Sequence, residues 1–476
     1  MKKGNTLAVV FMALALAVCS CNGPGKSATD SNDSANEVKE QTVGNEDVKP
    51  MAIAELKMAK DFTLDDTKGK KVNLTKNEVE FIGKAFGNWI TKKYGRKSEL
   101  ENRKIKVSIG YDARHTGPKF SKILRNVLKS MEIDVYDCQM SITPSLFMTT
   151  IFENYKADGA IMITASHLPS CYNGLKFFTT EGGLEKTDVV EMLEMGNKKA
   201  CQCEANLKEA LKIEEKKGRS YTKNLAEDYA TYTCEFIRKE TGEEKPLENL
   251  KIVIDAGNGA AGFFADKVIE ELGGNSEGSQ FLNPDGDFPN HVPNPEAKEA
   301  IESIKKAVLD NNADFGIIFD ADGDRSAFID NTGREINRNN LIALLSDILL
   351  KQTPGATIVT DSVTSAGLKK FIENHGGKHH RFKRGYKNVI NEAKRLNNEG
   401  VYTPLAIETS GHAAFINNYF LDDGAYMAAL LLIQLVKSKK EGVNFTDILN
   451  EVEEAAEEKE IRFTIKAEDF RSEGNK

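Results

Sequence analysis

The sequence predicts an α/β protein of three tandem, related α/β domains around a central cleft, and three observations support this. A chain of 476 residues is long enough for about three domains. From about residue 77, short apolar runs alternate with amphipathic stretches of helical period, which indicates α/β units with parallel sheets. This alternation restarts twice. Because such folds bind ligands at the carboxyl ends of their strands, we expect the loops after the strands to face one shared cleft.

The first round of alternation supplies the expected elements of domain 1. Residues 77–94 have the spacing of an amphipathic helix, and residues 118–131 predict a second helix. The runs IKVSIGYD (105–112), 133–137 and GAIMITAS (159–166) predict strands. The last run ends in Thr-Ala-Ser and is followed by His167, so polar side chains stand where a ligand-binding loop is expected.

Two further rounds follow along the chain. LKIVIDAGNGAAG (250–262) predicts a strand, a glycine-rich turn and a helix, and ADFGIIFDADGDR (313–325) predicts the next strand. GATIVTDSVTS (355–365) begins the third round, and TPLAIETSGHAAF (403–415) closes it. From these restarts we expect domain 1 at residues 57–225, domain 2 at 226–334 and domain 3 at 335–456.

Charge and cysteine usage exclude two classes of protein. The formal net charge is −8 and the pI is about 5.7, so no basic stripe is available to neutralise the phosphates of a nucleic acid. Beyond residue 21 the cysteines are odd in number, widely spaced and without a CxxC pair. This pattern argues against a disulfide framework and against a zinc site.

The N-terminus is predicted to be a targeting segment rather than part of the fold. An apolar stretch at 7–18 follows two lysines and is too short to span a membrane comfortably. It ends in LAVCSCNG, which resembles a bacterial lipoprotein signal with cleavage before a lipidated Cys21. Residues 1–21 are therefore the expected signal, and the polar residues 22–56 an expected disordered tether. We expect an exported, membrane-anchored lipoprotein; the alternative is a cytoplasmic protein with a misassigned start.

The stretch FDADGDRSAFID (319–330) carries the most specific motif. Asp320, Asp322 and Asp324 alternate in a turn after an apolar strand. Carboxylates so close together repel one another unless a cation lies between them, and hard oxygen ligands suit Mg²⁺. An EF-hand is excluded, because arginine stands at its glycine position and asparagine in place of its bidentate glutamate. We predict a Mg²⁺ site, against the alternative of a solvated Asp-Gly turn.

Ser166, His167 and Lys176 lie on IMITASHLPSCYNGLKFF (161–178), between two apolar runs. This loop has no aspartate to complete a hydrolase triad, and Ser166 is not in a G-x-S-x-G elbow, which argues against a serine hydrolase. A serine near a metal, with Lys176 and Arg325 as cations, suits phosphoryl transfer, in which the protein mainly positions groups and neutralises charge. Taken alone, Ser166 and His167 also fit loop residues satisfied by local hydrogen bonds.

Several motifs match one family as a set. TASHLPSCYNGLK, DADGDR and ETSGH occur in this order, and GYDAR (110–114), DAGNGAAG (255–262) and PDGDFPNHVPNPE (284–296) accompany them. Together they resemble the α-D-phosphohexomutases, the phosphomannomutase/phosphoglucomutase family, over about residues 75 to 460.

The resemblance implies roles for individual residues. The expected catalytic residues are Ser166, which would be phosphorylated, His167, Lys176 and Arg325. The expected ligands of Mg²⁺ are Ser166, Asp320, Asp322 and Asp324. The expected substrate contacts are Glu408 and Ser410, which would bind sugar hydroxyls, with His412, Lys387 and Arg114.

The implied reaction interconverts hexose 1-phosphate and hexose 6-phosphate, of glucose or mannose or both. Phosphoserine gives its phosphoryl group to the free hydroxyl, and the other phosphate of the resulting bisphosphate returns to the serine. Hexose 1,6-bisphosphate is the implied activator, and a closed, dry cleft would protect the phosphoserine from water. The general acid/base stays open between Lys176, Lys387 and His412, because Tyr386 and Lys387 stand where many relatives have Gly-His.

Residues 457–476 resemble only the start of the family's fourth, C-terminal domain. We expect its phosphate-gripping loop to be missing, which should lower kcat as well as raise KM, unless the sequence is truncated. A sugar-phosphate-binding lipoprotein with impaired catalysis is therefore an alternative. Phosphoglucosamine mutase is another, although Thr409 stands where such enzymes tend to carry glutamine. No oligomeric state is predicted.

Overall fold

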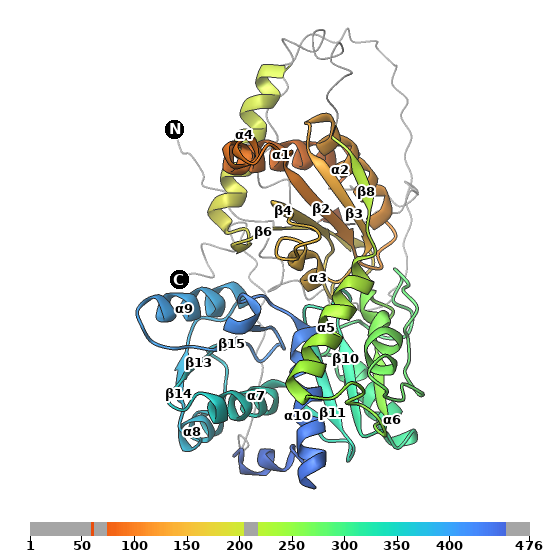
Figure 1. The fold of residues 1–476 in the computed structure, drawn as a ribbon, viewed down its shortest axis with the longest axis vertical. Helices are drawn as coiled ribbons and strands as arrows, with labels where there is room; N and C mark the ends of the chain where they lie inside the picture. Colours follow the sequence, from red (N-terminus) through yellow and green to blue (C-terminus); the bar gives the residue numbers. More distant parts are fainter. Residues whose placement is uncertain (1–58, 61–73, 204–217, 454–476) are drawn as a thin grey trace, which may run out of the picture.

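The computed structural model describes residues 59–60, 74–203 and 218–453, without the side chains of 59–60 and 197–203 (Figure 1). The predicted signal and tether and the predicted start of a fourth domain lie outside these residues, so export stays a prediction. Within the described part of the chain, no helix combines the length and the apolar character needed to cross a membrane.

The first domain is built on a six-stranded sheet of order β7-β6-β4-β2-β3-β8. Its strands are β2 (Lys106–Tyr111), β3 (Asp134–Met140), β4 (Gly159–Ile163), β6 (Leu175–Thr179), β7 (Gly182–Gly183) and β8 (Ser220–Thr222), with β1 (Ala59–Lys60) paired separately with β5 (Tyr172–Asn173). Its helices are α1 (Lys76–Leu100), α2 (Gly117–Ser130), α3 (Thr143–Met148) and α4 (Lys186–Cys203). Thr75 and Glu78 form a capping box that fixes the start of α1. Every residue of β4 is buried, because helices cover both faces of the sheet.

The second domain has a four-stranded sheet of order β12-β11-β10-β9. Its strands are β9 (Ile252–Asp255), β10 (Phe315–Phe319), β11 (Ser326–Asp330) and β12 (Glu335–Ile336), and its helices are α5 (Leu225–Thr241) and α6 (Lys298–Asp310). The helix expected after the glycine-rich turn is irregular: a 3-10 turn, η4 (Ala260–Gly262), precedes a π-helical turn, η5 (Ala265–Glu270).

The third domain also has a four-stranded sheet, of order β14-β13-β15-β16. Its strands are β13 (Thr357–Thr360), β14 (Lys378–Arg381), β15 (Leu405–Ile407) and β16 (Ala413–Phe415). Its helices are α7 (Arg338–Gln352), α8 (Ala366–Asn374), α9 (Tyr386–Asn398) and α10 (Gly424–Glu441), with 3-10 turns η6 (Ile416–Asn418) and η7 (Asp447–Glu451).

The prediction of parallel sheets is only partly right, because each sheet ends in an antiparallel hairpin. Strand β4 pairs antiparallel with β6, β10 with β11, and β15 with β16, whereas the central strands are parallel. A parallel partner needs a crossover of a dozen or more residues, for which the connections between these strands are too short. The hairpin loops, 164–174, 320–325 and 408–412, carry the three motifs predicted to be functional.

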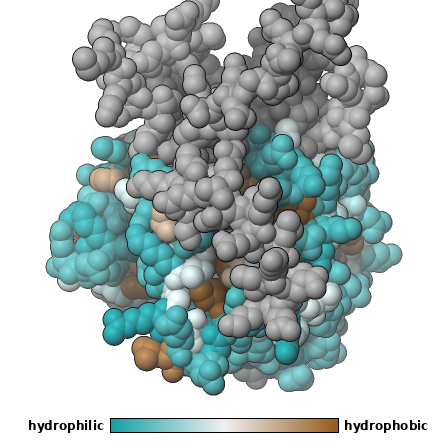
Figure 2. Space-filling model, turned by 90° about the horizontal axis from the view of Figure 1, so that it is seen from above, coloured by the Kyte–Doolittle hydropathy of each residue, from teal (hydrophilic) through white to brown (hydrophobic). Residues whose placement is uncertain are grey.

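One face of each sheet contributes to a single apolar core that runs through the three domains. Met162 of β4, Phe319 of β10 and Ile407 of β15 belong to it. Helices α5 and α10 pack against each other at its centre, where Tyr229 donates to Asp423 at 2.7 Å (Figure 1). The uncovered surface in Figure 2 is mostly hydrophilic, with small, separate hydrophobic areas. This shared core holds the three hairpin loops in fixed positions relative to one another.

Candidate active site

The three hairpin loops meet at Ser166. Its Oγ donates to Asp320 Oδ2 at 3.1 Å and accepts from Arg325 Nη2 at 3.3 Å, although both partners belong to the second domain. An isolated antiparallel bridge joins Arg325 to His412 and so links the second loop to the third. The side chain of Ser166 is 2% exposed. The sequence-predicted serine therefore lies against the predicted aspartate motif, as the shared-cleft prediction requires.

Ser166 has a left-handed backbone, with φ of +51°, which is unfavourable for a residue with a side chain. Two groups hold it there. Its N–H donates to Thr164 Oγ1 at 2.9 Å, and Thr164 in turn donates to Asp112 Oδ2 at 2.7 Å. Arg114 is fully buried and braces the same loop from behind.

Arg114 was predicted from sequence to contact substrate, but the structure gives it a bracing position. One guanidinium N–H donates to Asp112, and the others donate to backbone carbonyls of the serine loop. These carbonyls belong to Ser166, Leu168, Pro169 and Tyr172. Since a guanidinium has five N–H donors, all are occupied by the protein itself.

We expect Arg114→Lys to lower both stability and kcat. An ammonium has three donors, so two buried acceptors lose their partners, at about 1–3 kcal/mol each. Urea unfolding and steady-state kinetics would measure the two effects, with Arg125→Lys, which changes a partly exposed pair with Asp137, as the control. Unchanged stability with a raised KM for sugar phosphate would instead support the substrate contact.

The predicted metal ligands form a compact, buried group. One carboxylate oxygen from each of Asp320, Asp322 and Asp324 lies within 4.8 Å of the others. Gly323 between them has φ of +68°, and a Cβ there would lie 2.7 Å from the side chain of Ile142. Glycine is therefore required both for the turn and for the close approach of the first domain.

The charges of this group fit a hard divalent cation. Within the described residues, Asp322 Oδ1 and Asp324 Oδ1 are buried without a hydrogen-bond partner. Burial and repulsion from Asp324 and Asp322 raise the pKa of Asp320 well above its ordinary value. Buried carboxylate oxygens that lack donors and repel one another are stabilised by a cation with oxygen ligands. The residues present thus fit the predicted Mg²⁺.

Lys176 partly neutralises the same carboxylates. Its Nζ lies 2.8 Å from Asp322 Oδ2 and 2.6 Å from Asp324 Oδ2. Burial opposes the charged ammonium, but these two carboxylates outweigh it and hold the pKa of Lys176 well above its ordinary value. Lys176 is therefore a fixed positive charge beside the predicted metal.

Arg325 is oriented by residues on both sides. Its Nη2 donates to His167 Nδ1 at 2.6 Å, while Nη1 donates to Asn294 Oδ1 at 3.3 Å and lies 3.8 Å from Glu296. Because a guanidinium only donates, His167 Nδ1 accepts, which leaves the proton on Nε2. Burial and the charge of Arg325 lower the pKa of His167 to about 2, so the imidazole is neutral. Sequence reasoning assigned no role to Asn294 and Glu296, although both lie in the quoted motif PDGDFPNHVPNPE (284–296).

His412 lies beside Asp324 of the predicted metal group. Its Nδ1–H donates to Asp422 Oδ2, Tyr386 stacks on the ring at 5.1 Å between centroids, and Nε2 has no partner among the described residues. Burial lowers the pKa of His412 to about 4. Asp324 and Asp422 also place ligand atoms within 4.8 Å of His412. Asp422 and Tyr386 were not predicted as site residues, because no sequence spacing places them beside the ring.

The other two predicted sugar contacts are buried at the start of the third loop. Glu408 Oε1 accepts from the N–H of Gly385, and Ser410 Oγ lies 3.4 Å from Glu408 Oε2. Burial raises the pKa of Glu408. The positive φ of Gly411, +88°, closes this turn. Glu408 and Ser410 thus lie together on the loop that carries His412.

Lys387 was predicted as a substrate contact or acid/base, but the structure places it at a contact between domains. Its Nζ donates to the carbonyls of Gly183 at 2.6 Å and Leu184 at 2.8 Å, and lies 3.0 Å from Glu185 Oε1. These partners follow β6, the strand that carries Lys176. Lys387 therefore joins the start of α9 to the first domain.

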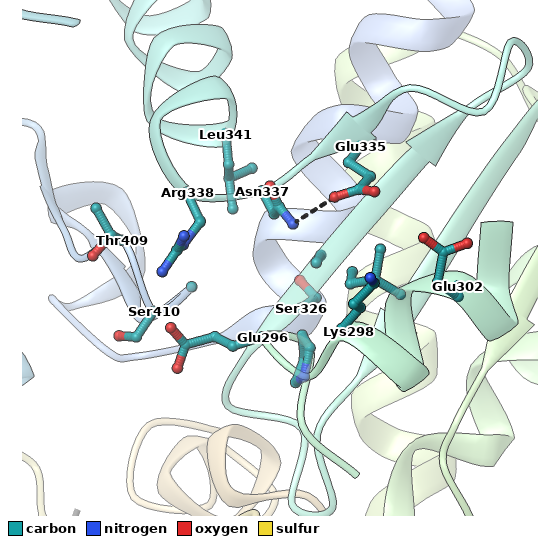
Figure 3. A pocket seen from close by; sticks show the side chains of 14 residues that line it. Glu296, Lys298, Glu302, Ser326, Glu335, Asn337, Arg338, Leu341, Thr409 and Ser410 are labelled. Carbon is teal, nitrogen blue, oxygen red and sulfur yellow. Dashed lines mark hydrogen bonds between the residues drawn. The ribbon is translucent and has the colours of Figure 1, made fainter. Parts of the chain in front are cut away.

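A cavity of about 340 Å³ lies beside the third loop, between the second and third domains. Figure 3 shows Thr409, Ser410 and Arg338 on one side of it, and Glu302 and Glu335 on the other. This volume is in the range of small-molecule pockets. Its lining includes Ser410 but not Ser166 or the three aspartates, so we do not place the chemistry there.

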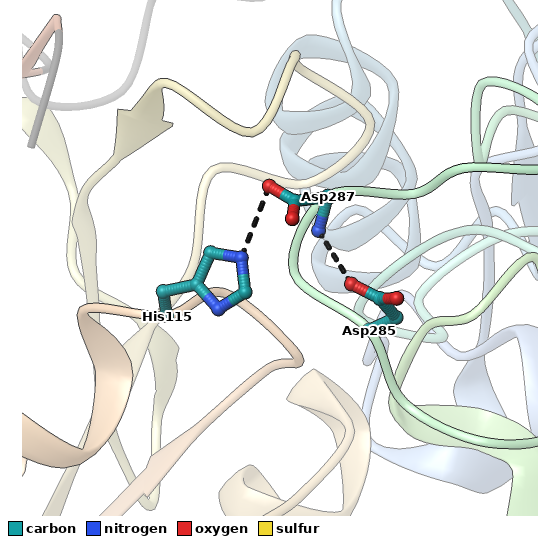
Figure 4. A group of neighbouring side chains, drawn as sticks. All are labelled: His115, Asp285 and Asp287. Carbon is teal, nitrogen blue, oxygen red and sulfur yellow. Dashed lines mark hydrogen bonds and ion pairs between the residues drawn. The ribbon is translucent and has the colours of Figure 1, made fainter. Parts of the chain in front are cut away.

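Two further sequence features lie on the surface and are not assigned a role. His115, Asp285 and Asp287 gather where loops of the first and second domains meet (Figure 4), and His115 Nε2 lies 3.0 Å from Asp287. Both of these side chains are largely exposed, which is common for acidic groups without a metal. A G-x-S-x-G match occurs at residues 274–278, but its Ser276 donates to Glu270 on a turn and is no hydrolase elbow.

Fold and site together define the class: an α/β protein of three domains whose loops are equipped for phosphoryl transfer. Family models for phosphoglucomutase/phosphomannomutase α/β/α domains I, II and III match residues 60–200, 220–333 and 337–455. The chain therefore belongs to this family, the α-D-phosphohexomutases, as its motifs predict. The predicted fold class and enzyme class, an intramolecular phosphotransferase, are confirmed.

Similar proteins have names of the same family. The chain is 31% identical over 358 residues to a phosphomannomutase/phosphoglucomutase of Pseudomonas putida, covering 75% of this chain and 71% of that protein. It is 28% identical over 393 residues to a phosphoglucomutase of Neisseria gonorrhoeae, covering 82% and 77%. A crystal structure of a phosphoglucomutase/phosphomannomutase family protein from Burkholderia thailandensis matches with a TM-score of 0.65 and 26% identity, covering 81% of this chain and 77% of that chain.

Proposed function

We propose that the protein interconverts the 1- and 6-phosphates of glucose, mannose or both, through phospho-Ser166 and a hexose bisphosphate. The observation that supports this best is the position of Ser166 Oγ, which contacts Asp320 and Arg325 of another domain. A hydroxyl held between a carboxylate group and a guanidinium suits transfer of a phosphoryl group, whose negative charge the guanidinium stabilises. Hexose 1,6-bisphosphate would act as activator by phosphorylating Ser166.

Asp320, Asp322 and Asp324 would hold Mg²⁺ beside the phosphoserine. When bound, the ion would neutralise charge on the transferring phosphoryl group. Lys176 fixes two of these carboxylates, and Arg325 faces the serine oxygen from the other side. Two cations, Lys176 and Arg325, thus lie around the group that holds the reacting oxygen, and the burial of Ser166 limits the access of water.

We assign the acid/base role to His412 among the three candidates. Lys176 is held protonated by two carboxylates, and Lys387 donates to three oxygens outside the site. His412 Nε2 is the nitrogen without a partner among the described residues, and Asp422 fixes the proton on Nδ1. A neutral imidazole oriented by a carboxylate suits a base that accepts the proton of a sugar hydroxyl.

The proposed steps balance in protons and bonds. The substrate hydroxyl oxygen bonds to phosphorus as the Oγ–P bond of phospho-Ser166 breaks, and the hydroxyl proton moves to His412 Nε2. Arg325 stabilises the released Ser166 oxygen, and the bisphosphate turns over without leaving the site. The Ser166 oxygen then bonds to the phosphorus at the other end of the bisphosphate. As that second sugar oxygen leaves, His412 returns the proton to it.

The purified chain, with Mg²⁺ and a trace of hexose 1,6-bisphosphate, should convert glucose 1-phosphate or mannose 1-phosphate to the 6-phosphate. Ser166→Ala should lower kcat by about 10³-fold or more, because the covalent carrier is lost. Ser170→Ala, an exposed serine on the same loop, is the control. Full turnover by Ser166→Ala would contradict the proposal. Binding without turnover by the parent would support the sugar-phosphate-binding alternative, and preference for glucosamine 1-phosphate would support the phosphoglucosamine alternative.

A further inference from the structure

Two acidic residues leave neighbouring parallel strands at the same edge of the third sheet. Strands β13 and β15 pair in register with Thr360 opposite Ile407. The next residue on β13 is Asp361 and the next on β15 is Glu408, so both follow the carboxyl ends of adjacent strands. Strands lie about 4.8 Å apart, which places two acidic residues within the width of one sugar ring. Sequence reasoning selected Glu408 but not Asp361.

Asp361 is fully buried, with a relative exposure of 0%, and only one of its carboxylate oxygens has a side-chain partner. Oδ2 accepts from Thr409 Oγ1 at 2.9 Å, and Thr409 adjoins the predicted sugar contact Ser410. Oδ1 is buried without a hydrogen-bond partner within the described residues. The backbone N–H groups of Thr409 and Val363 also stabilise this carboxylate, but neither meets Oδ1 as a hydrogen bond. A buried carboxylate oxygen without a partner is unfavourable, so a donor from outside the protein would stabilise it.

The surroundings of Asp361 favour a neutral hydroxyl as that donor. Burial raises the pKa of Asp361, although Thr409 opposes the shift, and the nearby negative charge of Asp361 contributes to the raised pKa of Glu408. The charge of Arg384 partly offsets this repulsion. Among the described residues, Asp361 belongs to no group of side chains that could hold a metal ion. Thr409, the hydrogen-bond partner of Asp361, also lines the cavity of Figure 3.

We propose that Asp361 is a second hydroxyl-binding residue of the sugar site: Oδ1 accepts a hydrogen bond from one ring hydroxyl, while Oδ2 positions Thr409. This inference rests on the proposed function and names a residue that helps to set the choice between hexoses. Glu408 and Asp361, on adjacent strand ends, then contact different hydroxyls of one ring. A buried acceptor that a hydroxyl completes discriminates strongly against a sugar that lacks this hydroxyl.

Substrate and protein changes made together test the contact. Asp361→Asn, Asp361→Ala and Thr409→Val would be assayed with glucose 1-phosphate and with its 2-, 3- and 4-deoxy analogues. We expect Asp361→Ala to lower kcat/KM for the parent sugar by about 10- to 100-fold, because a hydrogen bond to a charged group is lost. For one deoxy analogue, the same substitution should cause almost no further loss. Asp361→Asn keeps the shape of the side chain and removes its charge. If Asp361→Ala does not fold, the loss caused by Asp361→Asn should likewise be almost absent for that one deoxy analogue.

Thr409→Val separates binding from positioning. It removes the hydroxyl that Oδ2 accepts but leaves Oδ1, so its loss should be equal for the parent sugar and all deoxy analogues. If the Asp361 variants also lose the same factor on every analogue, the residue only braces Thr409 and the proposal is overturned. If the parent protein turns over the sugars while the Asp361 variants show this uniform loss, the proposed function stands and only the role of Asp361 is overturned. A parent that neither binds nor converts any hexose phosphate, as measured by calorimetry, overturns both.

Discussion

Removing divalent cations is expected to abolish turnover and to lower the melting temperature, and added Mg²⁺ is expected to restore both. Three buried carboxylates remain near one another without the ion, and two of their oxygens lack donors within the described residues. A cation that binds only the folded state adds about 2.7 kcal/mol of stability when its free concentration is about 100 times Kd. Chelator treatment followed by calorimetric scanning measures this independently of activity.

Asp322→Asn should reproduce the loss without a chelator. Asp322 shares Lys176 with Asp324, and an amide weakens both the ion pair and the metal site. Loss of several kcal/mol of transition-state stabilisation predicts a kcat about 10³-fold lower. Asp310→Asn is the matched control, because Asp310 pairs with Lys306 on the surface of α6. Full activity after chelation, and in Asp322→Asn, would contradict the metal assignment.

His412→Gln is expected to lower kcat by about 10²- to 10⁴-fold with little change in KM, as loss of a general acid/base does. Asp422→Asn should lower kcat less, because it removes the partner that orients the ring but leaves Nε2 in place. Steady-state kinetics separates the two parameters. His115→Gln is the control, since that histidine lies on the surface.

A raised KM at unchanged kcat in His412→Gln would contradict the acid/base assignment and support ground-state sugar binding. The remaining candidate would then be Lys176, and Lys176→Met should show the large loss of kcat. Lys387→Met should instead weaken the contact between α9 and the first domain, because its donors are used there.

The fold could be predicted because its pattern is local. Apolar runs such as β4 and β10 end at motif loops, and the alternation with helices defines the α/β class without knowledge of contacts. The antiparallel hairpins were missed because an apolar run does not show the direction of its partner. Loop length could have revealed them, since the segment between β10 and β11 cannot hold a crossover.

Site residues could be predicted where the residue type alone restricts the chemistry. They could not be predicted where the role of a residue depends on its hydrogen-bond partners. Three aspartates in one turn predict a cation site from residue type alone, and the structure brings their carboxylates together. By contrast, Arg114 and Lys387 are cations near motif residues, and only the structure shows that their donors bond to backbone carbonyls. Asp422 reaches His412 through an isolated bridge to Ala414, and Asp361 lies beside Glu408 through strand pairing, and neither arrangement gives a signal in the sequence.

The most direct test of the account is the location of the phosphoryl group on the protein. The purified chain would be incubated with hexose 1,6-bisphosphate and digested, and its peptides analysed by mass spectrometry before and after excess hexose monophosphate is added. The account predicts one phosphoryl group on Ser166, which the hexose monophosphate removes and which is absent from Ser166→Ala. Turnover without phosphorylation of Ser166, or with a phosphoryl group carried by another residue, would contradict it.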